Sequence, residues 1–105
     1  MSQAVVHAKT VYLAGQVADD TSADVAGQMR QVLSKIDRLL ADCGSHKSNI
    51  LSATVYLSDI GTFTAMNAEW DAWIAPDSKP ARATVEAQLA GPEYRVEIVV
   101  IAALD

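Results

Sequence analysis

Residues 95–104 read RVEIVVIAAL, and this stretch decides the fold. A strand has a two-residue period, so one face would carry Val96, Ile98, Val100 and Ala102, and the other Glu97, Val99, Ile101 and Ala103. Both faces are apolar apart from the glutamate, whereas a half-exposed antiparallel sheet has polar residues on its outer face. Two helices cover only one face of a small sheet. We therefore expect a second subunit on the other face, in a closed homo-oligomer.

Two helices are predicted before this strand. The first has Thr21 or Ser22 as N-cap and Gly44 as the residue that ends it. Its apolar residues recur at steps of three and four: Val25, Met29, Val32, Leu33, Ile36, Leu39, Leu40 and Cys43. The second helix follows the capping segment 59–62, and Pro76 stops it. Its apolar stripe is Phe63, Met66, Trp70 and either Trp73 or Ile74.

The remaining apolar segments predict strands. They are Val5–Val6, Val11–Val17, Ile50–Leu57, Ala81–Leu89 and Arg95–Leu104, with a turn at 90–93 between the last two. Within Ile50–Leu57, the residues predicted to share one face are Leu51, Ala53, Val55 and Leu57. Gly15 inside a strand indicates a bulge or the close approach of another group. The order β-β-α-β-α-β-β predicts a single α+β domain over 1–105, a sandwich with a mostly antiparallel sheet and two helices on one face.

Composition narrows the functional classes. The 105 residues contain 8 Lys and Arg against 13 Asp and Glu, giving a net charge of −5. The basic residues form no stripe of the kind that binds nucleic acid, so we expect no nucleic-acid partner. The absence of a long apolar run or a leader pattern predicts a cytoplasmic protein without a membrane partner. Cys43 is the one cysteine, and His7 and His46 lack metal-ligand spacing, so no metal site is expected.

Arg82 is the candidate functional residue, because it lies in a strand among small and β-branched neighbours. Alternation places Arg82, Thr84, Glu86 and Gln88 on one face, which we expect to be the face toward the other subunit, near Glu97. A guanidinium there needs an anionic partner. That partner is either Glu97, in a salt bridge across the interface, or the carboxylate of a small ligand.

Several segments resemble one known family, in order along nearly the whole chain. They are Ser2-Gln3-Ala4-Val5-Val6, Val11-Tyr12-Leu13-Ala14-Gly15-Gln16-Val17, Thr54-Val55-Tyr56-Leu57-Ser58-Asp59, Phe63-Thr64-Ala65-Met66-Asn67, Pro80-Ala81-Arg82-Ala83-Thr84-Val85 and Val96-Glu97-Ile98. The ordered set resembles the Rid family, also called YjgF. This resemblance implies a fold similar to chorismate mutase and a homotrimer with clefts between subunits. It further implies a cofactor-free hydrolase that converts reactive enamines and imines of amino acids, such as 2-imino acids, into 2-keto acids and ammonia.

The resemblance also assigns roles to residues. Arg82 matches the arginine that grips the substrate carboxylate, and Glu97 the glutamate that positions the attacking water. Gly15 and Asn67 match residues that line or brace the cleft, and we add Ala14 and Thr84 as substrate-binding residues. The best-known branch differs at three positions: it has tyrosine at the position of Met1, often serine at Ala14, and in some members cysteine at Thr84.

Two other functions compete with a deaminase. The same cleft in a non-catalytic trimer would bind a keto acid without turnover, or the trimer would act as a chaperone-like partner. A ribonuclease, which the family's older names suggest, is disfavoured by the acidic composition and the scattered basic residues.

Overall fold

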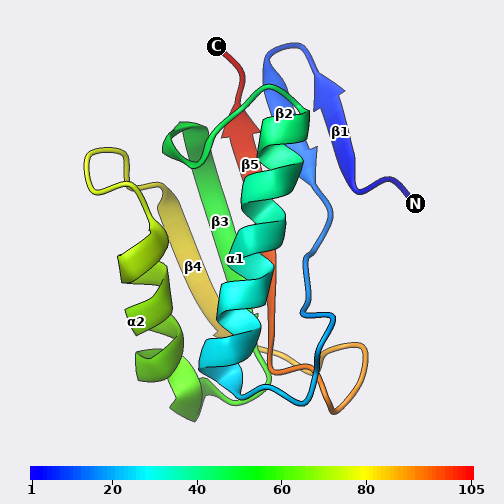
Figure 1. Ribbon diagram of the computed structural model, residues 1–105, viewed down its shortest axis with the longest axis vertical. Coiled ribbons are helices and arrows are strands. Elements are labelled where there is room, and N and C mark those ends of the chain that lie inside the picture. The colour runs from blue at the N-terminus through cyan, green and yellow to red at the C-terminus, as the bar shows by residue number, and fades with distance from the viewer.

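The computed structural model describes residues 1–105 as one sheet with two helices on the same face (Figure 1). The strands are β1 (Ala4–His7), β2 (Thr10–Leu13), β3 (Ile50–Leu57), β4 (Ala81–Glu86) and β5 (Val96–Ala103), and the helices are α1 (Val25–Asp42) and α2 (Phe63–Trp73). The spatial order is β1-β2-β5-β3-β4, and only the β3–β4 pair is parallel. The predicted α+β fold and its element order are confirmed. Neither helix has the length and apolar character needed to cross a membrane.

The first helix begins two or three residues later than predicted. Asp24 is the N-cap, and its carboxylate accepts a hydrogen bond from the Gly27 backbone N–H at 2.9 Å. The prediction of Thr21 or Ser22 as the N-cap was therefore wrong. An N-cap side chain accepts from a backbone N–H two or three residues further on, and Asp24 has this spacing to Gly27. Gly44 ends the helix as predicted, with φ of 79°, and the Ser45 N–H donates to Leu40 O at 2.8 Å. This arrangement satisfies the last carbonyls, and glycine adopts the left-handed conformation without a steric penalty.

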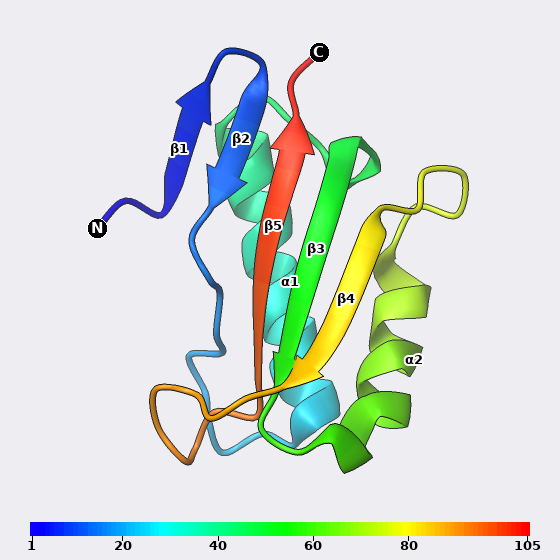
Figure 2. The same ribbon diagram turned by 180° about the vertical axis from the view of Figure 1, so that it is seen from behind.

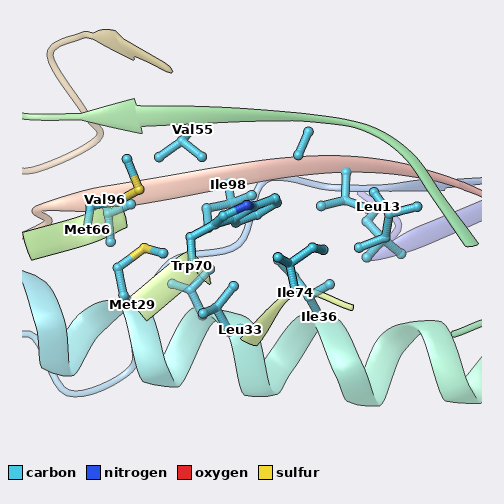
Figure 3. Packing of buried hydrophobic residues seen from close by; sticks show 14 of the residues in the cluster. Leu13, Met29, Leu33, Ile36, Val55, Met66, Trp70, Ile74, Val96 and Ile98 are labelled. Atoms are coloured by element: carbon cyan, nitrogen blue, oxygen red, sulfur yellow. The ribbon is translucent and has the colours of Figure 1, made fainter. Parts of the chain in front are cut away.

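The core lies between the two helices and the sheet (Figure 3). The inward residues of β5 are fully buried there, as the alternation of the segment predicts: Val96, Ile98, Val100 and Ala102. Met29 and Ile36 of α1 and Met66 and Trp70 of α2 pack against them. Both candidate residues at the end of α2 contribute, since Ile74 is buried and Trp73 packs against the core from its edge. This core fixes the positions of β3 and α2, and β4 is held by its pairing with β3, so that all three elements of the candidate site are positioned.

Strand β3 contains an irregularity that alternation alone does not predict. Ile50 pairs with Ala102 and Ser52 pairs with Ile101, so the register shifts between them. Leu51 is therefore turned out and 53% exposed, while Ile50 is buried. The prediction that Leu51 shares the core face with Ala53 was wrong, because an extra residue in one strand reverses the alternation on one side of it.

The first long strand is also interrupted. β2 ends at Leu13, and pairing resumes only at Gln16, which exchanges two backbone hydrogen bonds with Ile98 at 2.9 and 3.1 Å. The predicted continuous strand Val11–Val17 is therefore broken at Ala14 and Gly15. The break changes the register of this segment against β5 and leaves the two intervening residues beside the sheet face opposite the helices.

That opposite face has no covering element within the chain, as Figure 2 shows from behind. Tyr12 is 44% exposed and Val85 is 42% exposed, and the outward residues of β5 are only half-buried. Large apolar side chains thus lie open on the face that the sequence predicts a second subunit to cover.

Candidate functional site

Arg82 lies on the helix side of the sheet. It pairs with Ala53 of β3, which in turn pairs with Val100 of β5, and residues paired across neighbouring strands share a face. Ala53 and Val100 are both buried under the helices. The expectation that Arg82 faces the uncovered side was therefore wrong. On that side β4 presents Ala81, Ala83 and Val85 instead.

The Arg82 guanidinium rests on two aromatic rings of α2. Its Cζ lies 5.2 Å from the centroid of the Trp70 ring and 5.8 Å from that of Phe63. The side chain is half-buried. The salt bridges of the chain are Arg30–Glu69 and Lys35–Asp19, so Arg82 pairs with no carboxylate of its own chain. An arginine in this setting keeps its in-plane N–H donors available for an incoming anion.

Two further predicted residues belong to the same region. Thr84 pairs with Val55, which places it on the helix side with Arg82, and its buried Oγ1 has no hydrogen-bond partner. Asn67 is four residues after Phe63 and three before Trp70, so the three side chains lie on the same side of α2. Its Nδ2 donates to Asp71 at 3.3 Å. We call Phe63, Asn67, Trp70, Arg82 and Thr84 the arginine cluster.

Glu97 belongs to a second group on the uncovered face. It pairs with Tyr56 of β3, and its carboxylate packs directly against Gly15. A Cβ added at Gly15 would overlap Glu97 Oε2 and lie 2.9 Å from its Cδ. Ala14 precedes it, with its N–H donating to Gln3 O at 2.9 Å. The prediction of a close approach at Gly15 is confirmed, and we call Ala14, Gly15 and Glu97 the glutamate cluster.

A hollow of about 300 Å³ adjoins the glutamate cluster. It is lined by Tyr56, Ala87, Gln88, Leu89, Ala90, Glu97 and Val99. The segment 87–90 also borders a larger groove of about 630 Å³, which continues to Ser58 on one side and Pro92 on the other. Residues 87–90, which follow β4, therefore line both the hollow and the groove.

The two clusters do not meet within one chain. β3 lies between β4 and β5, so Glu97 is not on a strand adjacent to Arg82, contrary to expectation. Two strand spacings amount to about 10 Å, and the two side chains also project from opposite faces. With its guanidinium packed on α2, Arg82 cannot form a salt bridge with Glu97 of its own chain.

Sequence reasoning missed one buried polar residue, Gln28. It is fully buried, and its Nε2 donates to the carbonyls of Glu93, Ala23 and Thr21 at 3.1, 3.2 and 3.3 Å. Its Oε1 accepts from the Arg95 N–H at 2.9 Å. Gln28 therefore ties α1 to the segment that enters β5, two residues before Glu97. The available signal was a glutamine on the apolar stripe beside Met29.

Comparisons with known proteins agree with this architecture. The sequence profile of the family described as "Endoribonuclease L-PSP" matches residues 1–104. A RutC family protein of Haemophilus ducreyi is 47% identical over 104 residues, covering 99% of this chain and 89% of that protein. A goat protein named 2-iminobutanoate/2-iminopropanoate deaminase is 34% identical over 107 residues, covering 96% of this chain and 77% of that protein. The crystal structure of a YjgF family member from Neisseria meningitidis superposes with a TM-score of 0.97 at 46% identity, over 100% of this chain and 87% of that one.

Proposed function

Because this chain belongs to the family described as Endoribonuclease L-PSP, the YjgF/Rid family, we propose that it deaminates 2-imino acids and their enamine tautomers. The products are a 2-keto acid and ammonia. The observation that carries the proposal is the Arg82 guanidinium, which is half-buried, held on two rings, and unpaired with any carboxylate of its chain. The name of the goat relative supports the same chemistry.

The reaction requires few groups. Arg82 donates two parallel N–H bonds to the substrate carboxylate, and the Thr84 hydroxyl, which lacks a partner, adds a third polar contact. Water attacks the electrophilic imine carbon, and Glu97 orients that water and takes up its proton. Glu97 delivers this proton to the substrate nitrogen, which gives a tetrahedral carbinolamine, and the hydroxyl proton of the added water then moves to the same nitrogen. The C–N bond breaks, a carbonyl forms, and ammonia leaves, so water is the only co-reactant.

The proposed site combines two chains. Arg82, Thr84 and Asn67 of one subunit would face Ala14, Gly15 and Glu97 of the next, in clefts of a homotrimer. Two observations support this: the arginine and glutamate clusters lie on opposite faces of one chain, and the uncovered face carries exposed Tyr12 and Val85. Burying that face between subunits in a closed ring would remove its apolar surface from water. No metal or organic cofactor enters the proposal.

The direct test replaces Arg82 with alanine. We expect Arg82→Ala to lower kcat/KM for a freshly generated 2-imino acid by about 100-fold or more, because a desolvated charge pair is lost. Arg82→Lys should recover little, since an ammonium cannot make the planar two-pronged contact. The exposed Arg38 of α1 provides the matched control, and Arg38→Ala should leave turnover unchanged. Unchanged turnover in a folded, normally assembled Arg82→Ala protein would refute the proposal.

A second candidate is a carboxylate-binding module without turnover. It is favoured by one observation: a single chain supplies Arg82 together with the two aromatic rings that support it, whereas Glu97 lies on the other face of the sheet. Saturable binding of 2-ketobutanoate by calorimetry, with no ammonia released from 2-imino acids, would select this candidate over the deaminase. The net charge of −5 argues against the ribonuclease activity in the family's description.

A further inference from the structure

We infer that Phe63 and Trp70 act as a positioning platform for Arg82 and thereby set the affinity of the site for the substrate carboxylate. This inference rests on the proposed function. Neither ring needs to touch the reacting atoms. Their role is to hold the guanidinium in place before the ligand arrives, so that its donors face outward as a ready two-pronged clamp.

The geometry of α2 supports the platform. Phe63 and Trp70 are seven residues apart, two helical turns, and so lie on one stripe of the helix. The Arg82 Cζ is within 6 Å of both ring centroids, at 5.8 and 5.2 Å. Both distances fall within the range in which a cation is attracted to the face of a ring. One cation held by two rings is confined more than a cation over one.

The Trp70 half of the platform is rigid. Trp70 is only 5% exposed, and its ring packs against Trp73 with centroids 5.5 Å apart and an interplanar angle of 57°. Trp73 is in turn fixed to α1, because its Nε1 donates to Asp37 Oδ2 at 2.9 Å. The support of the guanidinium therefore extends through two indole rings to the other helix, and Figure 3 shows Trp70 inserted between α1 and the sheet.

The energetic reason for such a platform is preorganisation. An arginine side chain has many rotamers, and a ligand that had to select one of them would bind more weakly. A carboxylate of the same chain would hold the guanidinium equally well, but it would also compete with the ligand. Aromatic faces hold the cation and leave the N–H donors free. The absence of an ion pair at Arg82 agrees with this arrangement.

Phe63 permits a clean test, because it is 39% exposed and its truncation leaves no deep cavity. We expect Phe63→Leu to raise the Kd for 2-ketobutanoate, measured by calorimetry, by about three- to tenfold. KM for a 2-imino acid should rise by a similar factor while kcat stays within about twofold. This pattern is expected when a mutation weakens the binding of substrate and transition state equally. Phe63→Tyr keeps the ring and should return Kd to near the wild-type value. Ile60→Ala removes another exposed apolar residue nearby and serves as the control.

A spectroscopic readout separates positioning from mere stability. In a Trp73→Phe background Trp70 is the only tryptophan, because the chain has two. Titration with 2-ketobutanoate should change Trp70 emission in a saturable way, and the saturable component should vanish in Arg82→Ala. A purely structural role for the rings predicts a lower unfolding midpoint in Phe63→Leu with no change in Kd.

The outcomes distinguish the platform from the deaminase activity. Unchanged Kd and KM in Phe63→Leu would overturn the platform and leave the deaminase proposal intact. Conversely, 2-ketobutanoate binding that depends on Phe63, in a protein that releases no ammonia from 2-imino acids, would support the platform and refute the deaminase. A wild-type protein that binds no 2-keto acid would overturn both.

Discussion

The Glu97 carboxylate occupies the space that a side chain at position 15 would fill. The Gly15 backbone is not in the left-handed region, so alanine would fit its conformation, but the added Cβ would overlap the Glu97 carboxylate. We expect Gly15→Ala to displace that carboxylate and lower kcat for a 2-imino acid by about tenfold or more, because in the proposed reaction Glu97 orients the attacking water. The affinity for 2-ketobutanoate should change less. Wild-type kcat in Gly15→Ala would show that the position of Glu97 does not matter.

Asp20 lies in the turn before α1, and hydrogen bonds to its carboxylate lower its pKa. The Ser22 hydroxyl, and then the Ser22 backbone N–H, donate to its carboxylate and hold the pKa of Asp20 below its ordinary value of 3.8. A lowered folded-state pKa means that the stabilising contribution is present above pH 3.8 and is lost as pH falls through the folded value. Ser22→Ala removes the larger cause, so the pKa of Asp20 should rise toward 3.8. A carboxyl-carbon NMR titration measures this, and an unchanged pKa would contradict it.

Single residues show how far the sequence alone can go. The glycine at position 15 predicted a bulge or a close approach, and the structure shows the close approach, to Glu97. Arg82 was selected as a candidate functional residue from its strand neighbours, yet the face on which it lies was predicted wrongly. Alternation divides a strand into two faces but does not say which face meets the helices. Only the register of β4 against β3 supplies that information.

At the scale of elements, Gln28 joins α1 to the segment leading into β5. Replacing it with leucine would leave three backbone carbonyls and the Arg95 N–H without this partner. We expect Gln28→Leu to lower the free energy of unfolding by about 2 to 3 kcal/mol. Denaturant titration at fixed protein concentration measures the change. Gln31, one turn along the same helix, makes only exposed hydrogen bonds, so Gln31→Leu should cost less than about 1 kcal/mol. Equal losses in both variants would contradict this assignment.

The elements were more predictable than their irregularities. The periodicity of apolar residues located both helices and all five strands, because this signal comes from neighbouring residues in the sequence, although the N-cap of α1 was misplaced. The bulge at Leu51 and the break at Ala14–Gly15 arise from pairing with β5, which is far away along the chain. Trp70 also has a contact that depends on distant residues, although the sequence places it correctly in the apolar stripe of α2. Its ring is buried as expected, but its contact with Arg82 depends on how α2 lies over β4.

At the scale of the whole molecule, the two apolar faces of β5 remain the strongest sequence signal. One face is buried under the helices, and the other is half-exposed in the single chain. Strand β4, which carries Arg82 and Thr84, is at the edge of the sheet beside α2 (Figures 1 and 2). The glutamate cluster lies on the uncovered face. If adjacent subunits cover that face, the cleft between them is where the two clusters can meet, so assembly and activity are coupled in the proposed mechanism.

Subunit mixing tests this coupling directly. We propose to co-express Arg82→Ala and Glu97→Gln chains with different affinity tags and to purify through both, so that each purified assembly, the proposed trimer, contains both variants. In a cyclic trimer whose sites take Arg82 from one chain and Glu97 from its neighbour, one site of three regains both residues. Mixed trimers should therefore recover about a third of wild-type turnover, although each variant alone is nearly inactive. If both residues came from the same chain, no site would be intact. Mixed trimers that are as inactive as the parent variants would therefore rule out the composite site. If these inactive trimers still bound a 2-keto acid, the lost function would be catalysis and not ligand binding.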